Sequence, residues 1–270
     1  MEHWLAAVDY TQPTHTEGLE QYHIRCKKGD IGKAVIVPGD QSRVKMVADL
    51  LSEVKEVADN RGMITYTGIY RDTRISVTST GMGGPSAAIA YEELINVGAE
   101  VLVRVGSVAA LQPEIAPGDL SIPYGCIRDD GVTPYYVPQN FPAVPDPELY
   151  QSLVRNAEKQ GIRYWKGINW THSAFYSRSP EYFLQWSRKR VVTMEMEAAT
   201  LMTIAYLRGV SAAFIGTVFE NRQKQAEGHR MDLSVPSYKK PEVATGVEAS
   251  VKIALDACVE RVSQIQGGEQ

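Results

Sequence analysis

The sequence predicts a single α/β domain built around parallel strands, and two stretches carry this prediction. Residues 75–111 contain two apolar, β-branched runs, 75–80 and 101–105, which are joined by a segment whose apolar residues recur at helical spacing. A β-α-β unit of this kind requires parallel strands with a right-handed crossover. Residues 34–37 form another short apolar run that leads through a glycine into a helical segment. Because ligands bind beyond the carboxyl ends of parallel strands, both junctions are candidate sites.

The length and composition fit one large globular domain. The chain has 270 residues, of which 44% are hydrophobic and 22% are charged, and this is enough to bury one substantial core. We expect residues 1–20, which are polar and irregular, to form an N-terminal extension and residues 21–270 to form the domain. The net charge of −4 argues against a nucleic-acid-binding surface, and no apolar run is long enough to span a membrane.

The cysteines argue against two further classes of site. Cys26, Cys126 and Cys258 are odd in number, widely spaced and without a metal-ligand or C-x-x-C pattern. We therefore expect neither a bound metal nor a cofactor. A chain without a disulfide pattern or a targeting signal is expected in the reducing cytoplasm.

The N-terminal half of the domain predicts two strand-to-helix junctions and a hairpin. Gly39 follows the first apolar run, and the segment Gly81–Ser86 breaks a later one, where Pro85 suits the first turn of a helix. Gly98 ends that helix. In chain order, we expect strand 34–37, helix 44–51, hairpin strands 63–70 and 74–80, helix 86–97 and strand 101–105.

The C-terminal half alternates strands with three helices. Asp146-Pro147 is typical of a helix start, whereas Gly161 and Gly209 are typical of helix ends. In chain order, we expect strand 120–127, loop 128–147, helix 149–160, strand 164–170, aromatic loop 171–176, an apolar helix ending at residue 207, strand 212–219, charged loop 223–240 and helix 242–262.

Arg104 lies inside an otherwise apolar strand that opens into Gly106-Ser107. A buried guanidinium needs a partner and is suited to bidentate recognition of an anion. An internal ion pair with a carboxylate is the alternative, and strand chemistry alone does not decide between the two. The loop Gly81–Ser86 is a weak match to a dinucleotide fingerprint, because Ser86 stands where that pattern needs glycine and no acid ends the next strand.

Two further stretches are candidates. Gly39 and Arg43 lie at a strand-to-helix junction whose free backbone N–H groups could hold an anion, although the junction considered alone favours a turn with a solvent-exposed arginine. Glu195 and Glu197 flank Met196 at the start of an apolar helix. The helix dipole explains one acid there, whereas a second, inward-facing carboxylate would be a good acceptor for a vicinal diol such as that of ribose.

These residues carry a resemblance to a known family. The sequence resembles the hexameric type of nucleoside phosphorylase, a family that covers purine nucleoside and uridine phosphorylases. The matching segments occur in the family's order from about residue 20 to the C-terminus, and they are Val37–Asp40 with Arg43, Thr80–Ser86, Arg104–Ser107, Phe141–Val144 and Glu195–Thr200. The resemblance implies a phosphorylase/hydrolase-like fold, in which a twisted, mixed and partly barrel-like β-sheet is flanked by helices.

The resemblance also implies a role for each candidate residue, with nucleoside and phosphate as substrates and no cofactor. The implied phosphate-binding residues are Gly39, Arg43, Arg104, Ser107 and, from a neighbouring subunit, Arg61. The implied ribose-binding residues are Met196, Glu197 and the neighbour's His23, and the base-binding residues are Phe175, Glu195, Glu220 and Arg222. Glu220, Arg104 and Ser107 are the expected catalytic residues. Sharing of sites between subunits implies a homo-oligomer, which we expect to be a hexamer.

The base is expected to be a purine, with uracil as the alternative. Purine enzymes of the family place an acid after the last strand to protonate N7, and Glu220 stands at about that position, where Asp or Asn is usual. Uridine enzymes show a Gln-x-Arg pair shortly after the Phe-Tyr that corresponds to Phe175-Tyr176, and this pair is missing here. The segment Phe141–Val144 fits uridine enzymes equally well.

Two other function classes stay open at the level of sequence. A nucleosidase of the same fold would use water as the nucleophile and would have little need of Arg43 and Arg104. A nucleoside-binding protein without catalytic activity would keep the ribose site and could lose the anion site. The presence of both arginines disfavours these classes.

Overall fold

The structure is a computed structural model that describes residues 19–176, 179–226 and 239–268. The predicted N-terminal extension, residues 1–20, lies almost entirely outside the described residues, so this boundary stays a prediction. Most of the predicted charged loop, 223–240, also lies outside them.

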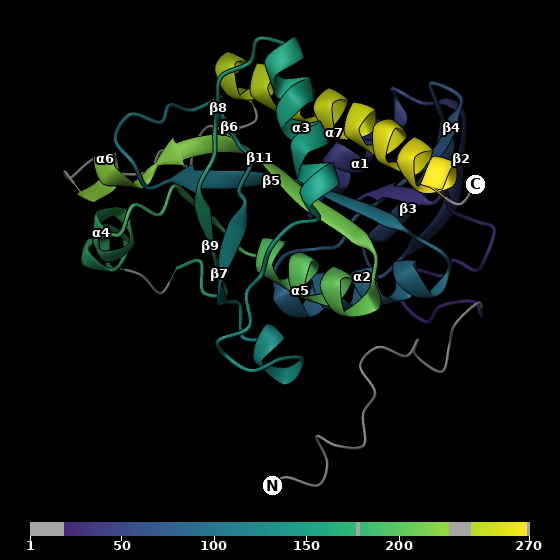
Figure 1. Ribbon diagram of the computed structural model, residues 1–270, viewed down its shortest axis with the longest axis horizontal. Coiled ribbons are helices and arrows are strands. Elements are labelled where there is room, and N and C mark those ends of the chain that lie inside the picture. Colours follow the sequence, from purple (N-terminus) through teal and green to yellow (C-terminus); the bar gives the residue numbers. More distant parts are fainter. Residues whose placement is uncertain (1–18, 177–178, 227–238, 269–270) are drawn as a thin grey trace, which may run out of the picture.

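Helices and strands alternate along much of the described chain (Figure 1). The strands are β1 (Ala34–Ile36), β2 (Ser52–Asn60), β3 (Met63–Tyr70), β4 (Thr73–Thr78), β5 (Val101–Ala110), β6 (Leu120–Ser121), β7 (Gly125–Asp129), β8 (Tyr164–Trp165), β9 (Ile168–His172), β10 (Thr193–Glu195) and β11 (Ser211–Asn221). The helices are α1 (Gln41–Ala48), α2 (Gly84–Asn96), the 3-10 helix η1 (Thr133–Tyr135), α3 (Pro147–Lys159), α4 (Pro180–Arg188), α5 (Ala198–Arg208), α6 (Arg222–Ala226) and α7 (Pro241–Gly268).

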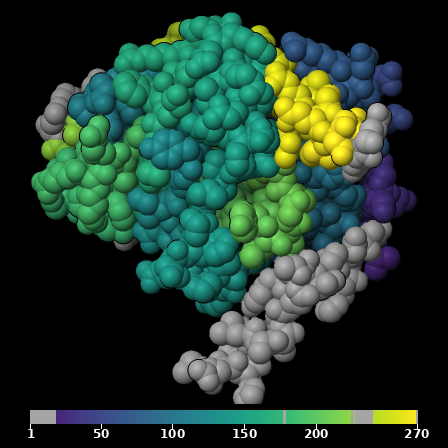
Figure 2. Space-filling model, in the orientation of Figure 1, coloured from purple at the N-terminus to yellow at the C-terminus, as the bar shows by residue number. Residues whose placement is uncertain are grey.

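Within the described residues, the strands form one mixed sheet in the order β2-β3-β4-β1-β5-β10-β9-β7, with β11 on β5, β6 on β11 and β8 on β6. Helices cover both faces of this sheet. Side chains of α1, α3 and α7 pack on one face, whereas α2 and α5 pack on the other. Figure 1 shows α3 and α7 above β5 and β11, with α2 and α5 below them. In Figure 2 the yellow atoms of α7 lie directly beside the teal atoms of the segment that contains α3. The predicted single α/β domain with a mixed sheet is confirmed.

Strand β5 is the centre of the sheet because it has three partner strands. Along one edge, β11 pairs in parallel with β5 from Val101 to Ala110. Along the other edge, β1 pairs only with Val101–Val103, and the antiparallel β10 pairs only with Ala109 and Ala110. Residues 104–108 therefore lie at a gap between β1 and β10, where no strand of the described chain pairs with that edge. The sheet opens at the segment that carries Arg104 and Ser107.

Most of the predicted elements are present. The hairpin is formed by β3 and β4, Asp146 caps α3 by accepting the Leu149 N–H, and Gly209 ends α5 in the left-handed conformation. The prediction that the strand beginning at residue 101 ends at 105 is wrong, because pairing with β11 extends this strand to Ala110. Arg104 and Ser107 accordingly lie within β5 and not at its end.

Other boundaries differ from the prediction for local reasons. The expected strands 120–127 and 164–170 are each two short strands. In the second, Gly167 separates β8 from β9, and Val192 packs so close that an added Cβ would lie 2.1 Å from a methyl carbon of that residue. Strand β2 and helix α4 were not predicted. The β2 residues are mostly exposed, so this strand lacks the apolar alternation that indicates one.

No helix of the described segments is long and apolar enough to cross a membrane. The same part of the chain contains no cluster of three or more His, Cys, Asp or Glu side chains arranged to hold a metal ion.

The close approach of α7 to the turn before β6 gives a test of the packing. A Cβ built on Gly246 would lie 2.4 Å from the Gly118 carbonyl oxygen and 2.8 Å from Thr217 Cγ2. We expect Gly246→Ala to lower the free energy of unfolding by about 1–3 kcal/mol, because backbone in the turn would have to move. Chemical denaturation measures this. The control is Gly267→Ala in the same helix, where an added Cβ has no neighbour within 4 Å among the described residues. A loss of stability of the same size there would contradict the packing argument.

Candidate active site

One cavity of about 700 Å³ brings together the predicted site residues. It lies where the sheet opens beside β5, and residues 39–43, 61–63, 81–86, 104–109, 194–197 and 219–222 contribute to its lining. Every residue predicted from the sequence to belong to the site lines this cavity, except His23. These segments are far apart in the sequence, and the fold brings the two glycine loops, the acids Glu195 and Glu197 and the aromatic Phe175 around one space.

Arg43 is buried beside β5 and not exposed in a turn. Its Nη1 donates to the Val105 carbonyl oxygen at 3.0 Å and its Nη2 donates to Ser107 Oγ at 3.0 Å. Burial, together with the like charge of Arg104, lowers the pKa of Arg43 to about 10. A buried guanidinium beside a second one favours the binding of an anion. The expectation that this junction is a turn with an exposed arginine is therefore wrong.

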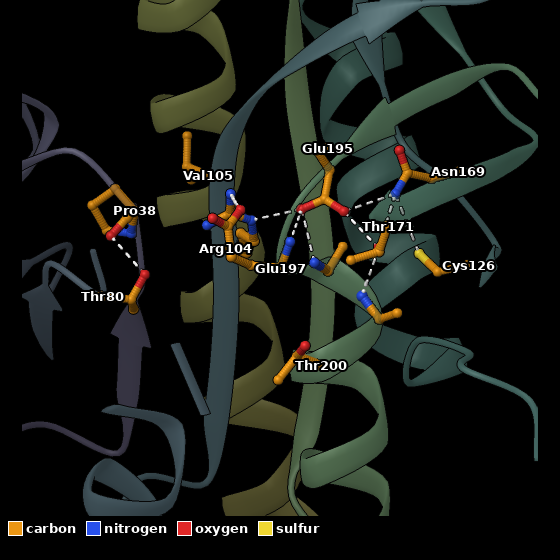
Figure 3. Close-up of polar contacts among 12 residues, drawn as sticks. Pro38, Thr80, Arg104, Val105, Cys126, Asn169, Thr171, Glu195, Glu197 and Thr200 are labelled. Atoms are coloured by element: carbon orange, nitrogen blue, oxygen red, sulfur yellow. Dashed lines mark hydrogen bonds and ion pairs between the residues drawn. The ribbon is translucent and has the colours of Figure 1, made fainter. Parts of the chain in front are cut away.

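Two glycine loops close the same end of the cavity. The Thr80 N–H donates to the Pro38 carbonyl oxygen at 2.9 Å, which ties the loop after β1 to the loop after β4. Thr80 Oγ1 donates to the same oxygen at 3.3 Å (Figure 3). A Cβ on Gly39 would lie 2.9 Å from the Gly81 carbonyl oxygen, so glycine is needed for the loops to approach this closely. The same point lies 3.8 Å from Arg104 Nη1. Within the described chain, this buried nitrogen has no hydrogen-bond partner, which is unusual for a buried donor.

Glu195, the last residue of β10, is the structural acid of the pair. One carboxylate oxygen accepts from Asn169 Nδ2 at 3.0 Å and from Thr171 Oγ1 at 2.6 Å. The other accepts from Arg104 Nε at 3.2 Å and from the Glu197 and Ala198 N–H groups at 2.7 and 2.8 Å (Figure 3). Glu195 therefore caps the N-terminus of α5, which is the role expected for one of the two acids.

Glu197 is the second acid, and its side chain makes no hydrogen bond that caps its own helix. It is 4% exposed, accepts from the Gly83 N–H at 2.5 Å and contacts Arg104 Nη2 through its other oxygen. Arg104 thus forms the internal ion pair with carboxylates that was the alternative, and it also lines the cavity with one nitrogen that no described residue binds. Recognition of an anion by Arg104 stays a prediction.

The charges of this cluster are unequal, since one guanidinium faces two buried carboxylates. Burial opposes the charge on Arg104, but the adjacent Glu197 and Glu195 carboxylates outweigh it and raise the pKa of Arg104. Burial raises the pKa of Glu197, and the charge of Arg104 offsets this only in part because the nearby Glu195 charge raises it further. The Glu197 carboxylate also accepts fewer hydrogen bonds than that of Glu195, and it would gain from hydrogen-bond donors such as hydroxyl groups.

The opposite end of the cavity is aromatic and carries a second ion pair. Phe219 is an extra residue in β11, because the pairing with β5 shifts between Val218 and Glu220. Such a bulge redirects the following side chain, and Glu220 lines the cavity. Glu220 pairs with Arg222 Nη2 at 2.5 Å, and the Arg222 guanidinium lies 5.8 Å from the centre of the Phe175 ring. This combination can stack on and hydrogen-bond a planar heterocycle.

Arg61 and His23 lie differently from the other predicted residues. Arg61 is the first residue of the two-residue turn between β2 and β3, with a φ of 54°, followed by Gly62 with a φ of 83°. This turn puts Arg61 at the cavity of its own chain. His23 lies outside the cavity, where its Nδ1 is 2.6 Å from Glu93 Oε1. The assignment of both residues to a neighbouring subunit's site stays a prediction.

Comparison with protein-family models decides the family. Residues 33–254 match the model of the phosphorylase superfamily, which is more than half of the chain and spans the whole cavity. The chain belongs to the phosphorylase superfamily. It is 42% identical to a uridine phosphorylase of Thermococcus kodakarensis over 80% of this chain and 82% of that protein. It is 36% identical to a guanosine phosphorylase of Halorubrum lacusprofundi over 88% of this chain and 98% of that protein.

A solved structure agrees with this family assignment. The purine nucleoside phosphorylase of Toxoplasma gondii, solved in complex with immucillin-H, has a TM-score of 0.84 and 31% identity to this chain, over 92% of this chain and 98% of that one. The predicted phosphorylase-type fold is therefore confirmed. The roles assigned to individual residues by resemblance stay predictions.

Some cavity residues of this superfamily member were not predicted. His172, Met194 and Phe219 line the cavity, while Thr171 and Asn169 hold Glu195. Apolar lining residues carry no chemical pattern by which a sequence could reveal them. The polar supports come from β9, which reaches Glu195 only through its pairing with β10.

The Glu195 cluster gives a test of what holds Arg104. We expect Glu195→Ala to lower the free energy of unfolding by about 3–5 kcal/mol, because it removes one partner of a buried ion pair and the cap of α5. Chemical denaturation measures the change. Glu181→Ala is the matched control, since Glu181 pairs with Arg188 while both side chains are 67% exposed, and we expect a change within about 1 kcal/mol. Equal effects of the two substitutions would contradict the structural role of Glu195.

Proposed function

We propose that this chain catalyses the phosphorolysis of nucleosides, which yields a free base and ribose 1-phosphate. The observation that carries the proposal is that two arginines, Arg43 and Arg104, line the same cavity as Glu197, a buried carboxylate with few hydrogen-bond donors. Arg43, Ser107 and Arg104 suit a phosphate, and Glu197 suits the 2′ and 3′ hydroxyls of ribose. The names of the relatives, uridine phosphorylase and guanosine phosphorylase, support this reaction.

The proposed reaction needs few groups besides those that position the substrates. A phosphate oxygen forms a bond to C1′ while the C1′–N bond breaks, and the electron pair of that bond leaves with the base. Arg43, Arg104 and Ser107 hold the anionic nucleophile on one side of a ribosyl cation-like state. Gly39 lines the same cavity beside Arg104, and Met196 offers an apolar surface to the ribose.

Departure of the base is helped by a proton. Phe175 stacks on the base, and Glu220 is the proposed proton donor to N7 of a purine, a role for which it must leave its ion pair with Arg222 and take up a proton from solvent before the base departs. Purine nucleosides are the proposed substrates on this ground. Uridine is the second candidate, and the observation that favours it is the 42% identity to the Thermococcus kodakarensis uridine phosphorylase.

The assembly is proposed to be a homo-oligomer, namely a hexamer with shared sites. His23 lies outside the cavity of its own chain, so it can reach a nucleoside only in another subunit. Arg61 is proposed to complete a phosphate site from the subunit boundary. We propose that the enzyme acts in the cytoplasm without a cofactor, with inorganic phosphate as co-substrate.

Release of free base in the presence and absence of phosphate tests the reaction. We expect inosine, guanosine, adenosine and uridine, each incubated with the enzyme, to give free base only when phosphate is present, because the cavity fixes an anionic nucleophile. Chromatography of the base measures this, and phosphate-free buffer is the control. Equal release without phosphate would identify a nucleosidase. Cleavage of uridine with no purine turnover would replace the purine proposal by the uridine alternative.

A second prediction concerns Glu220. We expect Glu220→Ala to slow cleavage of inosine or guanosine by roughly a hundredfold or more, which is the usual contribution of a positioned proton donor. Turnover of 7-methylguanosine should fall far less, since its base already carries the positive charge that the proton would supply. Steady-state rates on the two substrates measure the difference. Equal losses would reduce Glu220 to a structural or base-contacting residue.

A further inference from the structure

Arg104 is shared between the phosphate half and the ribose half of the cavity. Its Nε donates to Glu195 at 3.2 Å, its Nη2 contacts Glu197, and its Nη1 lies beside the glycine loop without a partner among the described residues. Figure 3 shows the guanidinium between the loop that carries Pro38 and the carboxylates at the start of α5. A phosphate held by the glycine loop and the arginines needs this same guanidinium.

The two carboxylates differ in how firmly they are held by other donors. Glu195 accepts from four donors besides Arg104, namely Asn169, Thr171 and two backbone N–H groups. Within the described chain, the Glu197 carboxylate accepts only from Arg104 and the Gly83 N–H. Glu195 can therefore stay in place when the guanidinium changes partners, with Nε as the anchor. Glu197 would lose the one cationic contact that the described residues give it.

We propose that Glu197 competes with phosphate for Arg104, so that phosphate binding frees Glu197 to accept the ribose hydroxyls. This inference rests on the proposed function and adds an order of substrate binding to it. Glu197, which is proposed to hold the nucleoside, also holds Arg104 until phosphate binds. Phosphate takes Nη1 and Nη2 of Arg104, and Glu197 then needs donors, which the vicinal diol supplies.

The competition makes each substrate favour the binding of the other. A buried carboxylate that has lost its ion pair is costly, so the diol is bound more strongly once phosphate is present. By thermodynamic linkage, the nucleoside raises the affinity for phosphate by the same factor. Couplings between sites typically change affinity by roughly 5- to 150-fold.

Direct binding of inorganic phosphate tests the competition without turnover. We expect Glu197→Gln to bind phosphate at least about fivefold more tightly than the wild-type enzyme in calorimetry without nucleoside, because the neutral amide holds Arg104 less strongly. A residue that serves ribose alone would leave phosphate affinity unchanged. Glu220→Gln is the matched control, since it removes one negative charge from the same cavity but its ion-pair partner is Arg222. We expect the phosphate affinity of this control, measured in the same way, to stay within about twofold of that of the wild-type enzyme.

The other outcomes are also decisive. Unchanged or weaker phosphate binding by Glu197→Gln, in a protein with a cooperative thermal transition, would overturn the proposal. Equal tightening in Glu220→Gln would do so too, because it would show a general effect of charge. If Glu197→Gln does not fold, Glu197→Ala is measured in the same way. The wild-type enzyme could bind phosphate and cleave nucleosides with it while Glu197→Gln binds phosphate no more tightly. That result would overturn this inference but leave the proposed function in place.

Nucleoside affinity gives the reciprocal measurement. Sulfate serves as an unreactive analogue of phosphate, and we expect it to tighten nucleoside binding to the wild-type enzyme by roughly 5-fold or more. The coupling should be lost in Glu197→Gln. Nucleoside binding that is independent of saturating sulfate in the wild-type enzyme would contradict the competition.

Discussion

The buried contact of Arg104 with Glu195 and Glu197 is the interaction on which the rest of the site depends. It joins the middle of β5 to the junction between β10 and α5. A guanidinium that is 4% exposed would be unstable there without carboxylates. Replacing such a cluster by apolar residues is often neutral or stabilising, so stability alone does not explain its presence in the core.

The sheet makes room for this cluster through the lengths of its strands. Strand β5 runs on beside β11 after β1 has ended and before β10 begins. Ligand-binding loops of α/β proteins follow the ends of strands, and here the loops after β1 and β4 close over a neighbouring strand that continues. The loops after β1 and β4 therefore follow the general rule for strand ends. Strand β5 differs, because Arg104 and Ser107 line the cavity from its middle and not from its end.

The sequence predicted which residues line the cavity better than it predicted how they are held there. Arg104, Glu197 and the glycine loops stand out because a charge in an apolar run or a glycine cluster needs a physical reason. The burial of Arg43 could not be predicted, because its partners, Val105 and Ser107, come from another strand. Strand β2 was missed for a related reason. It lies at the edge of the sheet and its exposed residues have no pattern that burial would impose.

The charges around the anion site explain why a third arginine is useful. Arg43 and Arg104 carry two positive charges, and Glu195 and Glu197 carry two negative ones, so these four groups are formally neutral before phosphate binds. A phosphate dianion would leave the cluster with an excess of negative charge in a poorly solvated space. Arg61 lines the same cavity from a tight turn, and left-handed backbone is uncommon for a residue other than glycine. If Arg61 completes a phosphate site as proposed, its guanidinium would supply the positive charge that the buried groups lack, and this exposed side chain would stay solvated until the anion binds.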